Sequence, residues 1–160
     1  MTDQPFVASG GMADGRSLVA ALALGADGIN MGTRFITTKE APAHDNAKQA
    51  LVAANELQTR LIMRPLRNTE RVLTNATVEK ILTVERDKGT AVTIEDIRHL
   101  VGGAGNRRVL QDGEMDAGAW SCRMAAGLIH DIPTCQELIG GIMAEAEAIV
   151  RSRLESLLAA

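Results

Sequence analysis

The chain has 160 residues, of which 46% are hydrophobic and 23% charged, with a mean hydropathy of +0.01. These values are typical of globular proteins and exclude disordered and fibrous classes. A net charge of -3 and only three aromatic residues (Phe6, Phe35 and Trp120) argue against nucleic acid as a partner. The core must therefore consist of aliphatic side chains, which favours helices and buried parallel strands over an aromatic-rich sandwich.

The N-terminal part predicts a strand–helix–strand unit. Residues 5–9 form a short apolar run that stops at two glycines, as a buried strand does. Asp14 can cap a helix over residues 16–24, and Gly25 suits its end. The pattern of residues 28–32 predicts a second strand. Two strands joined through a helix pair in parallel, so we expect an α/β protein.

The rest of the chain predicts mainly helices. We expect helices over residues 43–56, with Asp45 as a cap, over 77–87, and from Thr93 to about 102. The apolar piece at 61–63 is closed by Pro65, and residues 102–119 are rich in glycine and predict a loop. The clearest helix has Thr134 and Glu137 as a capping box and runs to about residue 158. Its expected buried stripe consists of Leu138, Ile142, Ile149, Leu154 and Leu157.

Glycines follow both predicted parallel strands. Gly10 and Gly11 come after the first strand, and Gly32 and Thr33 come after the second. Ligands bind to α/β proteins at the carboxyl ends of such strands, where glycines let backbone N–H groups approach an anion. Neither loop matches the dinucleotide-binding or P-loop pattern. Spacing alone leaves two readings open, a phosphate cradle and a pair of simple turns.

Several segments together carry a resemblance to a known family. They are Val7-Ala8-Ser9-Gly10-Gly11, Ala13-Asp14-Gly15-Arg16, Met31-Gly32-Thr33-Arg34-Phe35, Glu40-Ala41-Pro42-Ala43-His44, Leu66-Arg67-Asn68-Thr69, Trp120-Ser121 and Gly127-Leu128-Ile129-His130-Asp131-Ile132-Pro133. With them the chain resembles the C-terminal part of nitronate monooxygenases, formerly called 2-nitropropane dioxygenases. The first segments are shared with other FMN barrels, whereas the combination with the later segments is specific.

The resemblance implies a fold and a cofactor site. The fold is the end of an FMN-binding TIM barrel, contributing its last two strands, with a mostly helical second domain. Residues 1–40 would be the barrel end, 41–119 the second domain, and 120–160 a return segment with a helix that packs on the barrel. The resemblance implies that the backbones of Gly10, Gly11, Gly32 and Thr33 hold the FMN phosphate. It places Ala8 and Ser9 beside the flavin, with Trp120 and Ser121 near its mouth.

The function implied by the resemblance is oxidation of alkyl nitronates with O₂ to carbonyl compounds and nitrite. Two related activities remain as alternatives, NAD(P)H:quinone reduction and FMN-dependent enoyl-acyl-carrier-protein reduction. A third alternative is a fragment that binds FMN without catalysis. The expected partners are a small-molecule substrate (a nitronate, a quinone or NAD(P)H) and either further copies of the chain or a complementing N-terminal chain.

Two departures from the family pattern bear on the site. Arg123 stands where relatives usually have glycine, so a long cation enters the expected flavin site. The first six βα units of the barrel are missing, so we expect a truncated chain. The catalytic histidine of the family lies in that missing part, and no histidine here matches its motif. The sequence therefore assigns no catalytic residue.

The remaining predictions concern metal binding and cellular location. His130-Asp131 and the two cysteines, Cys122 and Cys135, lack the further ligands that a metal site requires. We expect both cysteines to be free thiols in a reducing compartment. The longest apolar run, residues 18–24, is too short to span a membrane, and the N-terminus does not resemble a signal peptide. These features predict a cytoplasmic protein.

Overall fold

The computed structural model describes residues 4–155. Its first elements are β1 (Val7–Ser9), α1 (Gly15–Ala23) and β2 (Gly28–Asn30). β1 and β2 pair in parallel, with Val7 opposite Gly28 and Ser9 opposite Asn30. The predicted strand–helix–strand unit is thus confirmed, with both strands shorter than expected. A short helix, α2 (Thr33–Ile36), follows β2 directly.

Helix α1 begins and ends where the sequence predicts. The Asp14 carboxylate accepts from the Ser17 backbone N–H at 2.8 Å, and the Ser17 hydroxyl accepts from the Asp14 backbone in return. This reciprocal cap satisfies N–H groups that the first helical turn leaves without partners. At the other end Gly25 has φ +94°, a conformation that L side chains rarely adopt. The loop into β2 can therefore turn within the four residues 24–27.

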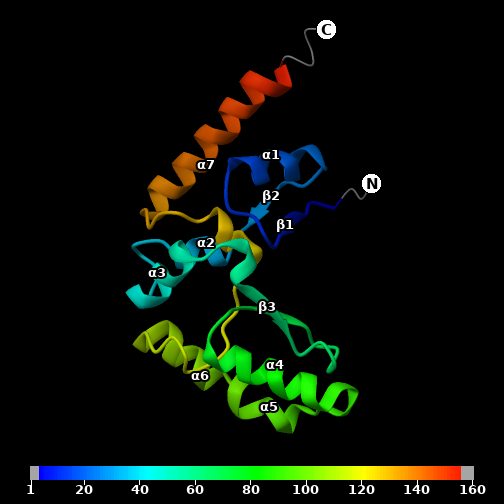
Figure 1. Ribbon diagram of the computed structural model, residues 1–160. Helices are drawn as coiled ribbons and strands as arrows, with labels where there is room; N and C mark the ends of the chain where they lie inside the picture. The colour runs from blue at the N-terminus through cyan, green and yellow to red at the C-terminus, as the bar shows by residue number, and fades with distance from the viewer. Residues whose placement is uncertain (1–3, 156–160) are drawn as a thin grey trace.

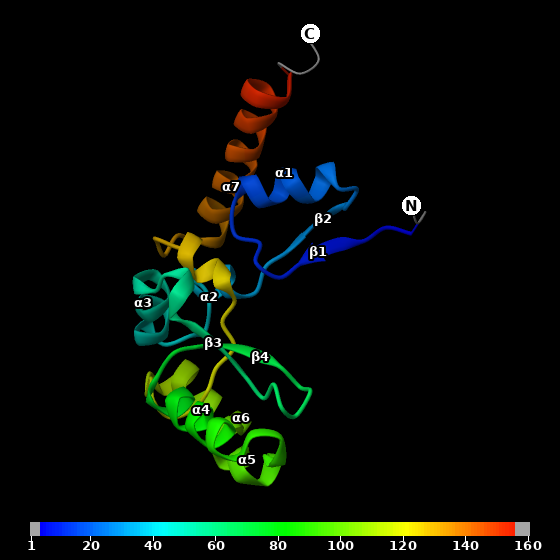
Figure 2. The same cartoon turned by 45° about the vertical axis from the view of Figure 1, so that its right-hand side comes forward.

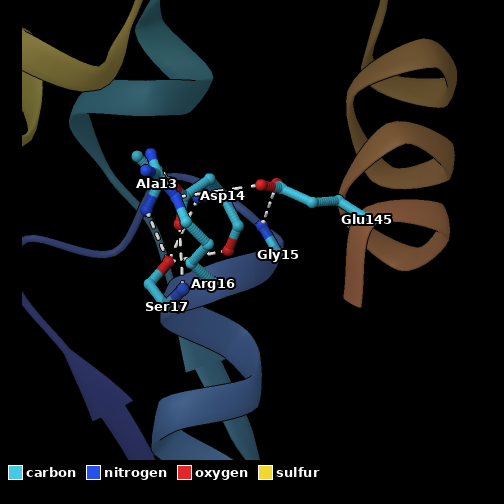
Figure 3. Close-up of polar contacts among 6 residues, drawn as sticks. All are labelled: Ala13, Asp14, Gly15, Arg16, Ser17 and Glu145. Atoms are coloured by element: carbon cyan, nitrogen blue, oxygen red, sulfur yellow. Dashed lines mark hydrogen bonds and ion pairs between the residues drawn. The ribbon is translucent and has the colours of Figure 1, made fainter. Parts of the chain in front are cut away.

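The C-terminal helix α7 (Cys135–Ile149) packs against α1, as Figures 1 and 2 show. Its predicted capping box is present, because the Thr134 hydroxyl accepts from the Glu137 backbone N–H while the Glu137 carboxylate accepts from Thr134. Figure 3 shows the contact with α1, where Glu145 accepts from the Gly15 backbone N–H at 2.7 Å. The buried positions of α7 are Leu138, Ile142 and Ala146.

The predicted stripe of α7 is wrong toward its C-terminal end. Leu154 lies in a π-helical turn, η5 (Val150–Leu154), and is 38% exposed. The stripe fails because α1 contacts α7 around residues 142–146 and does not extend as far as η5 (Figure 2). Leu157 lies outside the described residues.

The remaining elements follow α2 along the chain, and most of them lie on the far side of α2 from the two parallel strands (Figures 1 and 2). They are an antiparallel hairpin and a set of short helices: α3 (Asp45–Ala53), η1 (Glu56–Gln58), β3 (Thr59–Ile62), β4 (Glu70–Leu73), α4 (Ala76–Lys88), η2 (Gly89–Ala91), α5 (Ile94–Val101), α6 (Gly103–Arg107), η3 (Arg108–Asp112) and η4 (Met124–Leu128). The predicted helices at 43–56, 77–87 and 93–102 are confirmed within a few residues. Two apolar clusters stabilise this part, one around Trp120 and one around Ile81.

Three local predictions in this part are wrong. His44 caps α3 instead of Asp45, because its Nδ1 accepts from the Asn46 backbone at 3.1 Å. β4 was not predicted, and it pairs with the expected apolar piece at 61–63. Residues 102–119 contain α6 and η3 and are not simply a loop. A Cβ on Gly105 would lie 2.6 Å from the Ala117 carbonyl oxygen, so this glycine permits close backbone packing.

The start of α5 should make folding stability depend on acid pH. The Asp96 carboxylate accepts from Lys88 and from the Thr93 backbone, and these bonds lower the pKa of Asp96 from 3.8 to about 2. A carboxyl whose pKa is lower in the folded state stabilises the fold above its unfolded pKa. That contribution is lost as the pH falls from 3.8 through about 2. Asp96→Asn should therefore destabilise the protein at pH 7, with a difference that shrinks below pH 3.8.

Urea denaturation of both proteins across this pH range measures the difference. The matched control is Asp87→Asn, since Asp87 has an exposed side chain 3.8 Å from Arg86 and no role in a helix cap. If the difference in the free energy of unfolding between wild type and Asp96→Asn stayed constant down to pH 2, the proposed role of the Asp96 carboxylate in the cap would be contradicted. An exposed pair such as Arg86–Asp87 contributes little to stability in general.

Candidate functional site

A cavity of about 420 Å³ opens at the carboxyl ends of the two parallel strands. Three segments that are distant in sequence form its wall. They are the loop after β1, the junction of β2 with α2, and the return segment before η4. The lining residues are Ser9, Gly10, Gly11, Met12, Asn30, Met31, Gly32, Thr33, Ile36, Ser121, Cys122, Arg123 and Ala125. The two predicted glycine loops therefore converge on one space.

The two glycine loops differ in what they require of their residues. Gly10 has φ +92° and Gly11 has φ +78°, so any L side chain there would strain the backbone. Gly32 has φ −99°, which other residues adopt easily. A Cβ built on Gly32 meets no atom within 4 Å and so would project into open space. The conformation explains the first two glycines, whereas neither the conformation nor a protein contact requires a glycine at position 32.

Backbone hydrogen bonds hold the return segment in place. Trp120 accepts from the Leu73 backbone at 3.3 Å, and the Cys122 N–H donates to the Arg71 carbonyl at 3.0 Å. The segment thus adds to the edge of β4, where Ser121 pairs with Val72. The hairpin, which the sequence did not predict as such, positions the third wall of the cavity.

The return segment also contacts α2. The Arg123 backbone N–H donates to the Thr33 hydroxyl oxygen at 3.4 Å. That bond uses the oxygen as an acceptor and leaves the Thr33 hydroxyl proton free to donate. A second contact fixes the same helix from outside the cavity, because the buried Arg34 guanidinium pairs with Asp131 at 2.6 Å. Thr33 is therefore held by its own helix, by Arg123 and through the neighbouring ion pair.

The structure brings together five of the six predicted cofactor-binding residues. Ser9, Gly10, Gly11, Gly32 and Thr33 all line the cavity. Ala8 does not, and it lines a separate apolar cavity of about 400 Å³ with Phe6 and residues of α1. The period of two along β1 accounts for this split, since neighbouring side chains point to opposite faces.

Sequence reasoning missed other lining residues. Asn30 and Met31 could have been found, because they precede Gly32 at the carboxyl end of β2. Met12 could have been found too, because it follows Gly11 in the first glycine loop, whereas Ile36 and Ala125 carry no signal in the sequence that would place them here. They reach the cavity only through the packing of α2 and η4.

The chemistry of the lining suits binding of a small anion more than proton transfer. Among its residues within 4–155, Arg123 carries the only formal charge, and no His, Asp or Glu is present. Glycine N–H groups, the Asn30 amide and the Thr33 hydroxyl supply neutral donors. At the rim, the Ser121 hydroxyl donates to the Glu70 carboxylate. Also within residues 4–155, no group of three His, Cys, Asp or Glu side chains is arranged to hold a metal ion.

The two cysteines should differ strongly in reactivity. Burial raises the pKa of the Cys122 thiol to about 11, whereas Cys135 is partly exposed. A pKa of about 11 leaves about 0.1% thiolate at pH 8, and the thiolate is the reactive form. One thiol per chain should therefore react quickly with a disulfide reagent in the native protein, and the second only after unfolding.

Cys135→Ser and Cys122→Ser distinguish the two thiols in that assay. The Cys135→Ser protein should show no fast reaction, while Cys122→Ser should retain it. Fast reaction of the Cys135→Ser protein would mean that Cys122 is accessible, contrary to its full burial.

Comparison with known proteins agrees with this geometry. The sequence model described as nitronate monooxygenase matches residues 1–145. The chain belongs to the nitronate monooxygenase family. The resemblance seen in the sequence segments is therefore confirmed over most of the chain.

Curated relatives and solved structures extend this result. A Mycobacterium tuberculosis protein named (3aS,4S,5R,7aS)-5-hydroxy-7a-methyl-1-oxo-octahydro-1H-indene-4-carboxyl-CoA dehydrogenase is 30% identical over 91% of this chain and 50% of its own length. A probable nitronate monooxygenase of Staphylococcus haemolyticus is 47% identical over 34% of this chain and 15% of its own length. FabK from Thermotoga maritima superposes with a TM-score of 0.88 at 30% identity, over 98% of this chain and 48% of that one.

Two statements follow from these comparisons. The nitronate monooxygenase family and its solved neighbours imply a TIM-barrel fold, and β1 and β2 pair in parallel, as the strands of such a barrel do. The chain spans about half the length of the longest-matching curated relatives.

Of the helices within residues 4–155, none is both long and apolar enough to cross a bilayer.

Proposed function

We propose that this chain forms the phosphate-binding end of an FMN site in an oxidoreductase of the nitronate monooxygenase type. One observation carries the proposal, namely that the loops after two parallel strands and the return segment enclose one cavity. Gly10, Gly11, Gly32 and Thr33 would hold the phosphate, mainly through their backbones. Ser9 would lie beside the flavin, and Ala8 would support the strand from its other face.

The cavity fits such a group by two tests. A Cβ built on Gly32 meets no protein atom within 4 Å, so a phosphate oxygen would have room beside this backbone. The lining within residues 4–155 also holds no carboxylate that would repel an anion. When bound, FMN supplies the redox chemistry, and this chain's residues bind and orient it.

The reaction that we propose for the whole protein is oxidation of an alkyl nitronate with O₂ to a carbonyl compound and nitrite. A nitronate is already deprotonated, so its oxidation needs no base, but use of the parent nitroalkane needs a proton acceptor. The cavity lining has neither a histidine nor a carboxylate. We therefore propose that the acceptor lies on the remaining barrel units, as the family resemblance implies. The last two barrel strands, β1 and β2, would contribute the phosphate end alone.

The purified protein tests this proposal through flavin absorbance and turnover. We expect FMN to bind with a dissociation constant in the micromolar range or tighter, and to shift the fluorescence of Trp120, the single tryptophan. Bound FMN without nitronate-dependent O₂ uptake would restrict this chain to cofactor binding, the alternative that the sequence left open. A folded protein that binds no FMN at millimolar concentration would contradict the proposed function.

A second candidate substrate class is an acyl thioester. The relative that matches 91% of this chain is named as a dehydrogenase of a carboxyl-CoA compound. In addition, an apolar cavity of about 430 Å³ adjoins the first one and shares Met31, Gly32 and Ile36 with it. Phe35, Pro42 and Leu110 line it further and suit a hydrocarbon group. Reduction or oxidation of an acyl thioester, compared with nitronate oxidation and quinone reduction, distinguishes these activities.

An exposed apolar surface on β1 and α1 supports a proposal about partners. Phe6, Val7, Leu22 and Leu24 are 45%, 59%, 47% and 86% exposed. Exposed apolar side chains beside a two-stranded sheet are typical of a surface that another element covers. We propose that further barrel units cover this face, on a complementing chain or in a homo-oligomer. The division into residues 1–40, 41–119 and 120–160 belongs to the same proposal.

A further inference from the structure

Arg123 lies in the cavity without an ion-pair partner. Its side chain is exposed and lines the same space as Gly10, Gly11, Gly32 and Thr33. The ion pairs of residues 4–155 engage other arginines, such as Arg16 and Arg34, and none involves Arg123. Its guanidinium also makes no hydrogen bond to any residue within 4–155, although its backbone N–H is bonded to Thr33.

The backbone of Arg123 is nevertheless well fixed. The Cys122 N–H bond to β4 and the Arg123 N–H bond to Thr33 hold the residue from both sides. Fixing the backbone lowers the entropy lost when a long side chain binds a ligand. A guanidinium presents five N–H donors in a planar fork that matches phosphate geometry. A doubly charged phosphate held only by neutral donors would keep most of its charge uncompensated.

We propose that Arg123 binds the 5′-phosphate of FMN, adding a charged side chain to a cradle that otherwise consists of neutral donors. The inference rests on the proposed function and adds to it a residue that discriminates FMN from riboflavin. The guanidinium would bind phosphate oxygens that Gly10, Gly11, Gly32 and Thr33 leave free. Affinity for FMN would then depend on salt concentration, because an exposed ion pair is screened.

The test is a titration of the full chain with FMN and with riboflavin, each at low and at high NaCl. Trp120 fluorescence reports binding. Arg123→Gln removes the charge while keeping hydrogen-bonding groups, Arg123→Lys keeps the charge, and Arg64→Gln is the control, since Arg64 is exposed in the β3–β4 loop and does not line the cavity. We expect Arg123→Gln to weaken FMN binding by about ten- to a hundredfold and riboflavin binding by less than about twofold.

In the other proteins, FMN affinity should depend on whether residue 123 carries a positive charge. Arg123→Lys should retain most of the FMN affinity, and Arg64→Gln should bind both flavins as the wild type does. The wild type should lose FMN affinity with NaCl more steeply than Arg123→Gln does. Equal weakening of FMN and riboflavin would overturn the inference, because Arg123 would then act on the ring or on the fold. Unchanged or tighter FMN binding in Arg123→Gln would overturn it as well.

A second measurement separates this inference from the proposed function. Inorganic phosphate, titrated into isotope-labelled protein, should shift the amide resonances of Gly10, Gly11 and Gly32 in the wild type and much less in Arg123→Gln. Phosphate binding of this kind without FMN binding would refute the proposed cofactor and retain the anion site. FMN binding that Arg123→Gln leaves intact would refute the role of Arg123 and retain the proposed function.

Discussion

Gly15→Ala should lower the free energy of unfolding by about 2–4 kcal/mol, a large share of what a small protein has. Gly15 is the first residue of α1 and lies against α7, as Figure 3 shows. A Cβ there would stand 2.6 Å from the Ala146 nitrogen and 2.7 Å from the Ile142 carbonyl oxygen. Both atoms belong to helix backbone, so the added methyl group must push the two helices apart.

Separating the helices also removes a charged hydrogen bond. The Gly15 N–H donates to the Glu145 carboxylate at 2.7 Å, and Arg16 lies 3.8 Å from the same side chain. A carboxylate at a helix start is stabilising because it satisfies a free N–H at the positive end of the helix dipole. The expected loss therefore combines overpacking with a weakened cap.

Gly140→Ala is the matched control for this prediction. Gly140 lies in α7, the same helix that Gly15 touches, and is exposed, and its added Cβ would meet no atom within 4 Å. Alanine at an open helical position stabilises by up to about 1 kcal/mol relative to glycine. Urea denaturation followed by Trp120 fluorescence should thus show opposite signs for the two variants. A neutral Gly15→Ala would show that the two helices separate without cost.

Comparison of sequence and structure shows which features depend on local signals. The caps at Asp14 and Thr134 could be predicted because each is a contact between residues three positions apart. The parallel pairing of β1 and β2 followed from the helix between them. In contrast, β4 consists of two charged residues followed by two apolar residues, so it lacks the alternation that predicts a strand. It becomes a strand because it pairs with β3 and with Ser121.

The walls of the cavity likewise include some that local sequence signals predict and one that they do not. Its glycine loops could be predicted, because each glycine follows a strand end. Its third wall could not, since the Cys122 and Arg123 backbone bonds join residues far apart in the chain. His44 illustrates the limit for caps, because histidine is an uncommon capping residue and its role depends on packing beside Gly113. Contacts that long-range packing creates leave no local pattern to read.

Gly32→Ala should weaken FMN binding by about tenfold or more while leaving stability nearly unchanged. The conformation at Gly32 accepts alanine, and its Cβ would meet no protein atom within 4 Å. The methyl group would therefore disturb only what occupies the cavity. A phosphate oxygen bound to the backbone there would be displaced, with loss of a charge-assisted hydrogen bond.

A substitution at Gly32 tests FMN binding without a change in folding stability. Alanine at Gly10 or Gly11 would strain a backbone at positive φ, so reduced binding there would be ambiguous. Gly28→Ala, on the preceding strand β2, is the control, because its Cβ would make only an ordinary 3.9 Å contact with Val7 and Gly28 does not line the cavity. FMN affinity that falls in Gly32→Ala and not in Gly28→Ala, at equal stability, places the phosphate at the β2–α2 junction. Equal affinity in all three proteins would instead mean that the phosphate does not reach Gly32, and that the open space beside it is occupied by solvent.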